Sequence, residues 1–435
     1  MDITLRPARI CGTIDIPGSK SHTIRALLIA LFANGISTLH NALDSQDTQA
    51  CIELCRRLGA RITFKTDIPV PTLVIDSTAI ASEKEEITID CANSGTTLYL
   101  ASAMCAAGCT SKSIRFSGDE QLLKRPIEPL LDSLRDLGAT IEPKDSTTIP
   151  FTIHGPLDGG RTSIECRTSQ YLSALLLACP MAQSDSTIEV PLLNEKPYVR
   201  MTQYWFGKQK MDYSYNDELS LFHIKGNQHY KPFTECIGGD YSSATFFFCA
   251  AAMTGGTITV NGLDRSDPQG DKAVLSVLEQ MGCTVEWSGS GVTLNGPQRL
   301  KAGEFDINDI PDALPALAVA SCFADGEVKL YNVKQARLKE TDRIATMARC
   351  INELGGNAVE LDDGIEIHPV EGFTAKKIDG CNDHRIVMAM ALASLRCAGS
   401  LTIRGAQAAA VTFPTFFGLL SKVSVPKEVD SRTSV

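Results

Sequence analysis

The sequence lacks the features of a membrane protein or a nucleic-acid-binding protein. Its longest apolar stretches, such as 245–253 and 386–395, fall well short of the roughly 20 residues that cross a bilayer. Basic residues are in the minority, with 41 Lys and Arg against 51 Asp and Glu and a formal net charge of −10. Because a nucleic-acid backbone is bound by a basic surface, we expect neither a membrane nor a nucleic acid as partner.

Targeting and metal-binding signals are also missing. The first residues have neither the basic and apolar regions of a signal peptide nor the Arg and Ser of a transit peptide. The fifteen cysteines, an odd number scattered through apolar segments, fit reduced buried thiols better than a disulfide framework. Cys51/Cys55 and Cys105/Cys109 each stand four apart, but no second pair or nearby His completes a tetrahedral set. These observations predict a cytoplasmic protein with no metal.

The composition is that of a folded protein. Hydrophobic residues make up 43% and charged residues 21% of 435 residues, whereas a disordered chain would be poor in apolar residues. Aromatic residues account for only 6%, so the cores must rely on Ala, Leu, Ile and Val. The length predicts two or more domains.

One pattern occurs six times: a polar or Gly-containing turn, an apolar helix of small residues, and a strand. The turns start at residues 18, 93, 168, 238, 310 and 381, so successive starts lie 70 to 75 residues apart. The apolar helices that we expect to be buried include 24–33, 97–107, 243–253, 314–323 and 386–395. Four units add an amphipathic helix that ends before a Gly, at 47–58, 126–137, 271–281 and 341–354. The third unit is degenerate, and its second helix, near 198–211, is not placed by the pattern.

Units of this length are too long for a solenoid and predict two groups of three. We expect one domain at 19–234, and a discontinuous one at 1–18 and 235–435, which the N-terminal strand Asp2–Ile16 joins. If the two groups face each other, the six turns converge on one cleft. Since helix N-termini present free N–H groups and a positive dipole end, such a cleft suits anions.

Several turns carry charged side chains. Gly18-Ser19-Lys20-Ser21 fails the spacing of a phosphate loop, which leaves either an anion-binding turn or a simple helix cap with a surface Lys. Arg125 stands before a Pro that begins a helix, and Arg offers paired donors to a carboxylate or phosphate. Asp312 could cap its helix, move protons together with Glu340, or do both.

The motifs together resemble the EPSP synthase family. The residues that carry the resemblance are Pro17-Gly18-Ser19-Lys20-Ser21, Asn93-Ser94-Gly95-Thr96, Arg125-Pro126, Ser169-Gln170-Tyr171, Lys196-Pro197-Tyr198, Gly239-Asp240-Tyr241-Ser242-Ser243-Ala244, Pro311-Asp312, Lys339-Glu340-Thr341-Asp342-Arg343, Asn382-Asp383-His384-Arg385 and Thr412-Phe413-Pro414. The resemblance spans about residues 3–423. The combination of Lys-Glu-Thr-Asp-Arg with Asn-Asp-His-Arg is highly specific, because the sister enzyme of the same architecture lacks it.

The resemblance implies an α/β (α+β) fold of six βαβαββ repeats, in two domains of three around a cleft. It implies transfer of enolpyruvyl from phosphoenolpyruvate to the 5-hydroxyl of shikimate 3-phosphate, in aromatic amino acid biosynthesis, without a metal. We also expect a monomer and no cofactor. Shikimate 3-phosphate would contact Ser21, Arg25, Ser169 and Gln170, with Asp312 near its reacting hydroxyl. Phosphoenolpyruvate would contact Lys20, Arg125, Arg343 and Arg385. Asn93, Gly95 and Lys339 are further binding candidates, and Lys20, Asp312, Glu340 and His384 are the catalytic candidates.

At three positions the chain departs from the family's usual residue. Tyr99 replaces an Arg, Val411 replaces a Lys, and Glu195 replaces a Ser, so two cations are missing and one anion is added. Two alternatives therefore stay open. One is an enolpyruvyl transferase with a changed acceptor, and the other is a non-catalytic homologue that binds phosphorylated ligands or serves as one part of a larger assembly.

Overall fold

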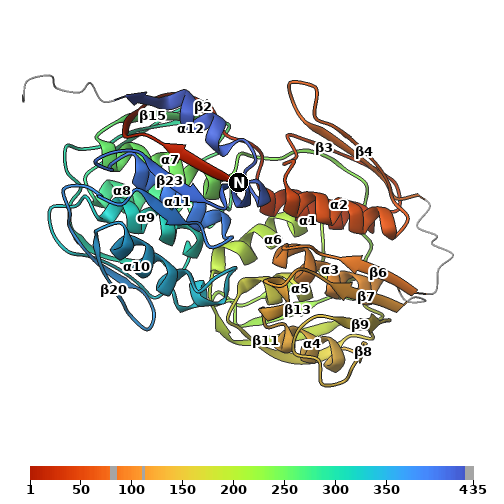
Figure 1. Cartoon of the computed structure of the whole chain (residues 1–435). Helices are drawn as coiled ribbons and strands as arrows, with labels where there is room; N and C mark the ends of the chain where they lie inside the picture. The colour runs from red at the N-terminus through yellow and green to blue at the C-terminus, as the bar shows by residue number, and fades with distance from the viewer. Residues whose placement is uncertain (79–85, 110–112, 427–435) are drawn as a thin grey trace, which may run out of the picture. The chain divides into compact units, whose positions relative to one another are not determined.

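The computed structural model describes residues 1–78, 86–109 and 113–426. The chain forms two compact units, each built from several small mixed sheets and the helices that connect their strands (Figure 1). The first unit comprises residues 1–16, 239–265 and everything from 271 onward. The second comprises residues 17–238 and the short segment 266–270.

The second unit contains two continuous βαβαββ repeats. The elements of one are β6 (Glu86–Asp90), α3 (Gly95–Gly108), β7 (Ser113–Ser117), α4 (Glu128–Asp136), β8 (Thr140–Glu142) and β9 (Phe151–His154). Those of the other are β10 (Gly160–Cys166), α5 (Ser169–Ala178), β11 (Ser186–Leu193), α6 (Lys196–Gln209), β12 (Tyr213–Tyr215) and β13 (Leu221–Ile224). In each, the first two strands are parallel and the last two form an antiparallel hairpin that pairs with the second strand. This is the repeat implied by the family resemblance.

The remaining repeat of this unit borrows its first strand from far along the chain. Its continuous elements are α1 (Lys20–Leu31), β3 (Ile36–His40), α2 (Gln46–Arg57), β4 (Arg61–Lys65) and β5 (Thr72–Asp76). The parallel partner of β3 is β14 (Thr234–Cys236), with Thr234 opposite Thr38. The last strand of the unit therefore completes its first sheet.

The first unit repeats the same plan. One sheet with its helices comprises β2 (Ala8–Asp15), α7 (Tyr241–Thr254), β15 (Thr257–Asn261), α8 (Ala273–Gln280), β16 (Thr284–Ser288), β17 (Gly291–Asn295) and β24 (Ser424–Pro426). The next uses β18 (Gly303–Asp306), η4 (Pro311–Ala313), α9 (Leu314–Ser321), β19 (Val328–Tyr331), η5 (Lys334–Leu338), α10 (Arg343–Glu353), β20 (Asn357–Glu360) and β21 (Ile365–His368). The third uses β1 (Asp2–Leu5), β22 (Lys377–Asp379), α11 (His384–Ser394), β23 (Leu401–Arg404), η6 (Ala406–Val411) and α12 (Phe416–Val423).

The five predicted apolar helices are confirmed, and they form the centre of each unit. Helix α3 packs against both α1 and α5, while α9 packs against both α7 and α11. Their side chains are buried on every side, because Ala, Ser and Cys let neighbouring helices approach closely from all directions. The charged residues of these five helices lie in their first two turns, in or next to which most candidate site residues lie.

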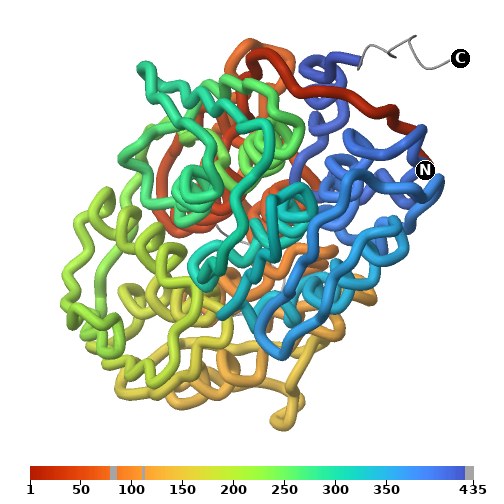
Figure 2. Tube along the Cα trace, turned by 90° about the vertical axis from the view of Figure 1, so that its left-hand side faces the viewer, coloured from red at the N-terminus to blue at the C-terminus, as the bar shows by residue number. Residues whose placement is uncertain are grey.

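Two local predictions need correction. The N-terminal segment Asp2–Ile16 is not one strand: Pro7 interrupts it, and β1 pairs with β23 while β2 pairs with β15. Figure 2 shows this red segment beside the blue C-terminal part of the chain. The helix that the pattern left unplaced is α6, whose N-cap Glu195 has a left-handed φ of 56° and no capping side-chain bond. No helix among the described residues is both long and apolar enough to cross a bilayer.

The buried His22 ring links the segment 266–270 to the rest of the second unit. Its Nε2 donates to the Asp267 carboxylate at 3.2 Å, and the Trp205 indole N–H donates to Nδ1 of the same ring at 3.0 Å. The Trp205 contact orients the ring, since Nδ1 accepts while Nε2 donates.

We expect Asp267→Ala to loosen this segment. A charge-assisted hydrogen bond contributes about 1.5–3 kcal/mol, so amide hydrogen exchange of residues 266–270 should accelerate roughly tenfold or more. Mass-resolved hydrogen exchange measures this, with Asp217→Ala, an exposed position, as the control. Unchanged exchange in Asp267→Ala would mean that other contacts hold the segment.

Candidate active site

The candidate residues of the second unit lie at the beginnings of its apolar helices. Lys20, Ser21 and Arg25 are on α1, Asn93 and Gly95 begin α3, Arg125 follows a short 3₁₀ turn at Leu122–Lys124, and Ser169 and Gln170 begin α5. Each of the three helices has a hydroxyl N-cap, from Ser19, Ser94 and Thr168. These turns can be recognised in the sequence because each is followed by an apolar stretch.

Arg25 is a buried cation whose described partners are neutral. Its side chain is 1% exposed and donates to Thr202 Oγ at 3.0 Å and to Ser173 Oγ at 3.2 Å. It also donates to the carbonyl oxygens of Ser21 and Tyr198, both at 3.2 Å. Burial lowers the pKa of Arg25 to about 10, which still leaves it protonated at neutral pH. A buried positive charge that is met only by neutral oxygens favours an anionic ligand.

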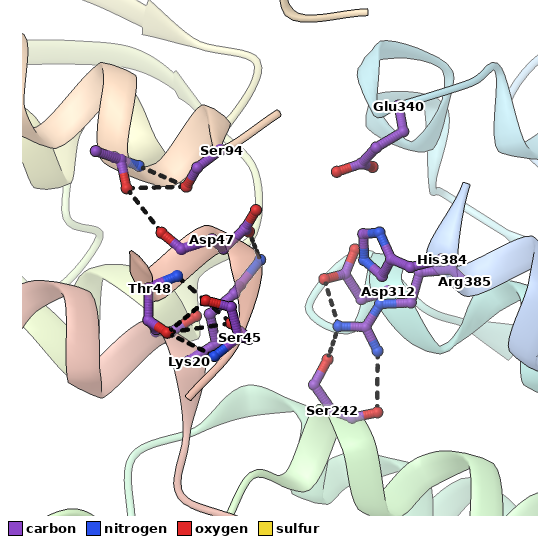
Figure 3. Close-up of polar contacts among 12 residues, drawn as sticks. Lys20, Ser45, Asp47, Thr48, Ser94, Ser242, Asp312, Glu340, His384 and Arg385 are labelled. Carbon is purple, nitrogen blue, oxygen red and sulfur yellow. Dashed lines mark hydrogen bonds and ion pairs between the residues drawn. The ribbon is translucent and has the colours of Figure 1, made fainter. Parts of the chain in front are cut away.

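Lys20, in contrast, is ion-paired. Its ammonium lies 2.9 Å from the carboxylate of Asp47, which is 4% exposed at the start of α2 (Figure 3). Helix α2 begins at Ser45, which forms a capping box with Thr48. The capping box fixes the first turn of α2, and with it the carboxylate that orients Lys20.

The loop that carries Arg125 is fixed from two sides. Asn93 donates from Nδ2 to Asp119 at 2.7 Å and to Gln121 at 2.8 Å, so Asn93 acts as a support for this loop. Gly95 makes room for the guanidinium, since a Cβ at this position would lie 2.5 Å from Nη1 of Arg125. Gly95 is therefore required by the close approach of Arg125 to the start of α3.

Two tyrosines hold the next residue of that loop. The hydroxyls of Tyr99 and Tyr171 both donate to the carbonyl oxygen of Pro126, at 3.2 and 2.6 Å. Their rings meet edge to face with centroids 5.3 Å apart. Tyr99, one of the three departures, thus has a positioning role beside Arg125. Val411, another departure, ends η6 in the first unit and is half-buried.

Glu195, the third departure, is the N-cap of α6, and its carboxylate lies at the beginning of α5. Its carboxylate accepts from the Ser169 backbone N–H at 3.1 Å, from Ser169 Oγ at 2.9 Å and from Thr168 Oγ at 3.2 Å. It is 1% exposed. An anion at a helix N-terminus is favourable, so Glu195 takes the hydrogen bonds that a ligand anion would use there. Next to it, the buried Oε1 of Gln170 has no hydrogen-bond partner among the described residues.

In the first unit, one arginine gathers three carboxylates. Arg343, the first residue of α10, is 1% exposed and contacts Asp383 at 2.9 Å, Asp312 at 2.8 Å and Glu340. Burial opposes its charge, but these carboxylates raise the pKa of Arg343 above its ordinary value. The structure therefore brings together Asp312 and Glu340, the two acids predicted to move protons. Lys339 precedes Glu340 and is half-buried.

Arg385 connects Asp312 to the first turn of α7. It donates to the carboxylate of Asp312 at 3.2 Å and to the hydroxyl and the backbone carbonyl of Ser242 at the start of α7 (Figure 3). Its Nε is buried and has no hydrogen bond to the described residues. The neighbouring His384 is 2% exposed, and its Nδ1 has no hydrogen bond either. Both nitrogens can serve a ligand.

Sequence reasoning missed several supporting residues. Asp383 caps α11 by accepting from the Arg385 N–H at 2.8 Å while it also holds Arg343. Its place between Asn382 and His384 in a recognised motif was the available signal. Nothing in the sequence marked Asp47 or Ser173, because each is distant along the chain from the cation that it contacts.

His384 makes stability depend on pH. Burial lowers the pKa of His384 from 6.5 to about 3, so the ring stays neutral in the folded protein. In the unfolded chain it takes up a proton below pH 6.5, and stability therefore falls as the pH drops from 6.5 toward 3.

We expect His384→Gln to remove about 2 kcal/mol of the stability difference between about pH 7.5 and about pH 5. Urea unfolding of the variant and of the parent protein at both pH values measures the difference. His223→Gln, at an exposed position on β13, should leave the pH dependence unchanged. Equal pH dependence in His384→Gln and the parent would contradict a neutral His384.

Comparisons with known proteins agree over nearly the whole chain. The family model for EPSP synthase (3-phosphoshikimate 1-carboxyvinyltransferase) matches residues 5–420. The 3-phosphoshikimate 1-carboxyvinyltransferase of Acetivibrio thermocellus is 43% identical over 97% of this chain and 98% of its own length. The protein of the same name from Ruminiclostridium cellulolyticum is 42% identical over 96% and 97%. The solved EPSP synthase of Acinetobacter baumannii has a TM-score of 0.80 at 25% identity, covering 98% of both chains. Given the repeats, the motifs and these matches, the chain belongs to the EPSP synthase family.

Proposed function

We propose that this chain transfers the enolpyruvyl group of phosphoenolpyruvate to the 5-hydroxyl of shikimate 3-phosphate. The products are phosphate and 5-enolpyruvylshikimate 3-phosphate. Both substrates are polyanions, and the observation that carries the proposal is the buried charge of Arg25, which is met by neutral oxygens in the described contacts. The match to the family over residues 5–420 supports it independently.

In this proposal the second unit supplies the contacts to the phosphate of shikimate 3-phosphate. Arg25 provides the charge, and Ser21, Ser169 and Gln170 provide hydrogen-bonding groups. Three of these residues lie in the first turns of α1 and α5, where the helix dipole also favours an anion. In the same proposal, Asp312 of the first unit lies near the reacting 5-hydroxyl.

Phosphoenolpyruvate is assigned to Lys20, Arg125, Arg343 and Arg385, with Gly95, Asn93 and Lys339 beside them. Arg343 and Arg385 are held rigidly by Asp383 and Ser242. Fixed guanidinium groups suit a carboxylate or a phosphate because they offer paired donors. Asn93 contributes by holding the loop that carries Arg125 in place.

The chemistry requires two proton movements. The 5-hydroxyl loses a proton as its oxygen bonds to C2 of the enol, and the methylene carbon gains one, which gives a tetrahedral intermediate. The intermediate then loses a proton from the new methyl group and expels phosphate, which restores the double bond. Asp312, Glu340 and Lys20 are the proton carriers, while His384, neutral at physiological pH, contributes hydrogen bonding. Fixed cations stabilise the charge that develops during both stages.

The proposal also covers the setting of the reaction. The enzyme acts as a monomer in the cytoplasm, without a cofactor. All fifteen cysteines are free thiols, which agrees with a reducing compartment.

The direct test is phosphate release by the purified protein given both substrates. Turnover should require shikimate 3-phosphate and phosphoenolpyruvate together. Lys20→Met should lower kcat by about a hundredfold or more, since a fixed charge near the reacting atoms is removed, while Lys65→Met, exposed on β4, should not. Circular dichroism verifies folding of both variants. A folded parent protein without turnover would refute the transferase and leave a changed acceptor or a non-catalytic role.

Glu195 generates a further prediction. Because its carboxylate holds Ser169, it competes with the phosphate of shikimate 3-phosphate. Glu195→Gln should therefore lower the KM for this substrate about tenfold, with little change in the KM for phosphoenolpyruvate. Glu189→Gln on β11 is the control. An unchanged or higher KM for shikimate 3-phosphate would mean that Glu195 supports the site instead of competing for it.

A further inference from the structure

Two cysteines meet in the first unit beside the candidate site. Cys350 lies on α10 and is fully buried, while Cys381 is half-exposed in the turn between β22 and α11. The two thiols interact, since each changes the pKa of the other. Helix α10 packs against both α11 and β22, so the contact belongs to the packed core of one repeat.

Cys381 also contacts a cation. Arg349 donates to its sulfur at 2.8 Å and is itself paired with Glu353 at 2.7 Å. The hydrogen bond from Cys350, together with Arg349, lowers the pKa of Cys381 to about 7, although burial and Asp379 oppose this. The lowered pKa of Cys381 favours its thiolate, which is the nucleophilic form.

The other close cysteine pairs provide an internal comparison. In the second unit, burial and the neighbouring thiol Cys55 raise the pKa of Cys51. The neighbouring thiol Cys109 and burial likewise raise the pKa of Cys105. Cys51 and Cys105 are therefore protonated thiols in an apolar core and should be unreactive. Only the pair at Cys381 combines, among the described residues, a second thiol, a contacting arginine and exposure to solvent.

We propose that Cys381 is a peroxide-reactive thiolate that condenses with Cys350 into a reversible disulfide. Hydrogen peroxide is the oxidant. The Cys381 sulfur attacks one peroxide oxygen, the O–O bond breaks, and Cys381 becomes a sulfenic acid as hydroxide leaves. The Cys350 sulfur then attacks the Cys381 sulfur, and the sulfenic oxygen leaves with the Cys350 proton. Overall, two thiols and one hydrogen peroxide give one disulfide and two waters.

The modified turn leads directly into the candidate site. Cys381 and Asn382 both have a left-handed backbone, with φ of 54° and 51°, and Asp383 follows them. Asp383 caps α11 and holds Arg343. Drawing the Cys381 sulfur from Arg349 toward Cys350 shifts this turn, so oxidation lowers the turnover of the proposed reaction. This effect on turnover rests on the proposed function, whereas the disulfide does not.

The test is a titration of the reduced, intact protein with hydrogen peroxide. Intact mass should fall by the two hydrogens of one disulfide, peptide mapping should join Cys350 to Cys381, and dithiothreitol should reverse both changes. In Cys350→Ser, dimedone should trap a sulfenic acid at Cys381. Arg349→Met should react about fivefold more slowly at neutral pH, because a rise of one unit in the pKa of Cys381 reduces its thiolate fraction by that factor.

Exposed thiols elsewhere are the control. Cys236→Ser should form the disulfide at the parental rate, and Cys381→Ser should form none. First reaction at Cys11 or Cys236, or oxidation of Cys381 without a bond to Cys350, would overturn the proposal. Because the masses are read without substrates, a protein that forms the disulfide but shows no turnover would contradict only the proposed function. A disulfide that leaves turnover unchanged would contradict only the regulatory effect.

Discussion

The ion pairs of Arg343 are the constraint on which the candidate site of the first unit depends. Carboxylates stabilise this buried guanidinium, and they come from η4, from the segment before α10 and from the cap of α11. Removing one partner of a buried pair costs about 3–5 kcal/mol, because the remaining charge stays buried. The arrangement of Asp312, Glu340 and Asp383 is therefore held by the stability of the fold itself, and the carboxylates are placed before any substrate arrives.

The buried charges of Arg343 and Arg25 are compensated in opposite ways. In the first unit, the carboxylates around Arg343 and Arg385 balance the cations, which suits proton transfer at Asp312 and Glu340. In the second, Arg25 is met by hydroxyls and carbonyls, so its charge is compensated only in part. A cation of the second kind favours binding of an anion, whereas a balanced cluster favours precise orientation. The contrast explains why the proposal assigns phosphate binding to Arg25 and proton transfer to Asp312 and Glu340.

Much of the fold followed from the sequence because each repeat has the same physical order. A buried apolar helix carries its charged residues near its beginning, so the periodic turns located five helices and most candidate residues together. Contacts between distant segments did not follow. The pairing of β14 with β3, the support of Arg25 by Ser173 and the role of Asp383 each depend on tertiary packing. Helix α6 could not be placed from the sequence because its N-cap is a Glu in a left-handed conformation, without the usual capping bond.

The three departures from the family's usual residues have different physical consequences. Tyr99 exchanges a charge for a hydroxyl that holds Pro126, so the loss of a cation is accompanied by a firmer position for Arg125. Val411 provides no polar group in place of the cation. Glu195 places an anion on the hydrogen bonds of Ser169. A carboxylate already seated at a helix N-terminus stabilises the free protein and must be displaced by a ligand. Its contribution to stability and its cost to affinity therefore have the same origin, and both scale with the strength of those hydrogen bonds.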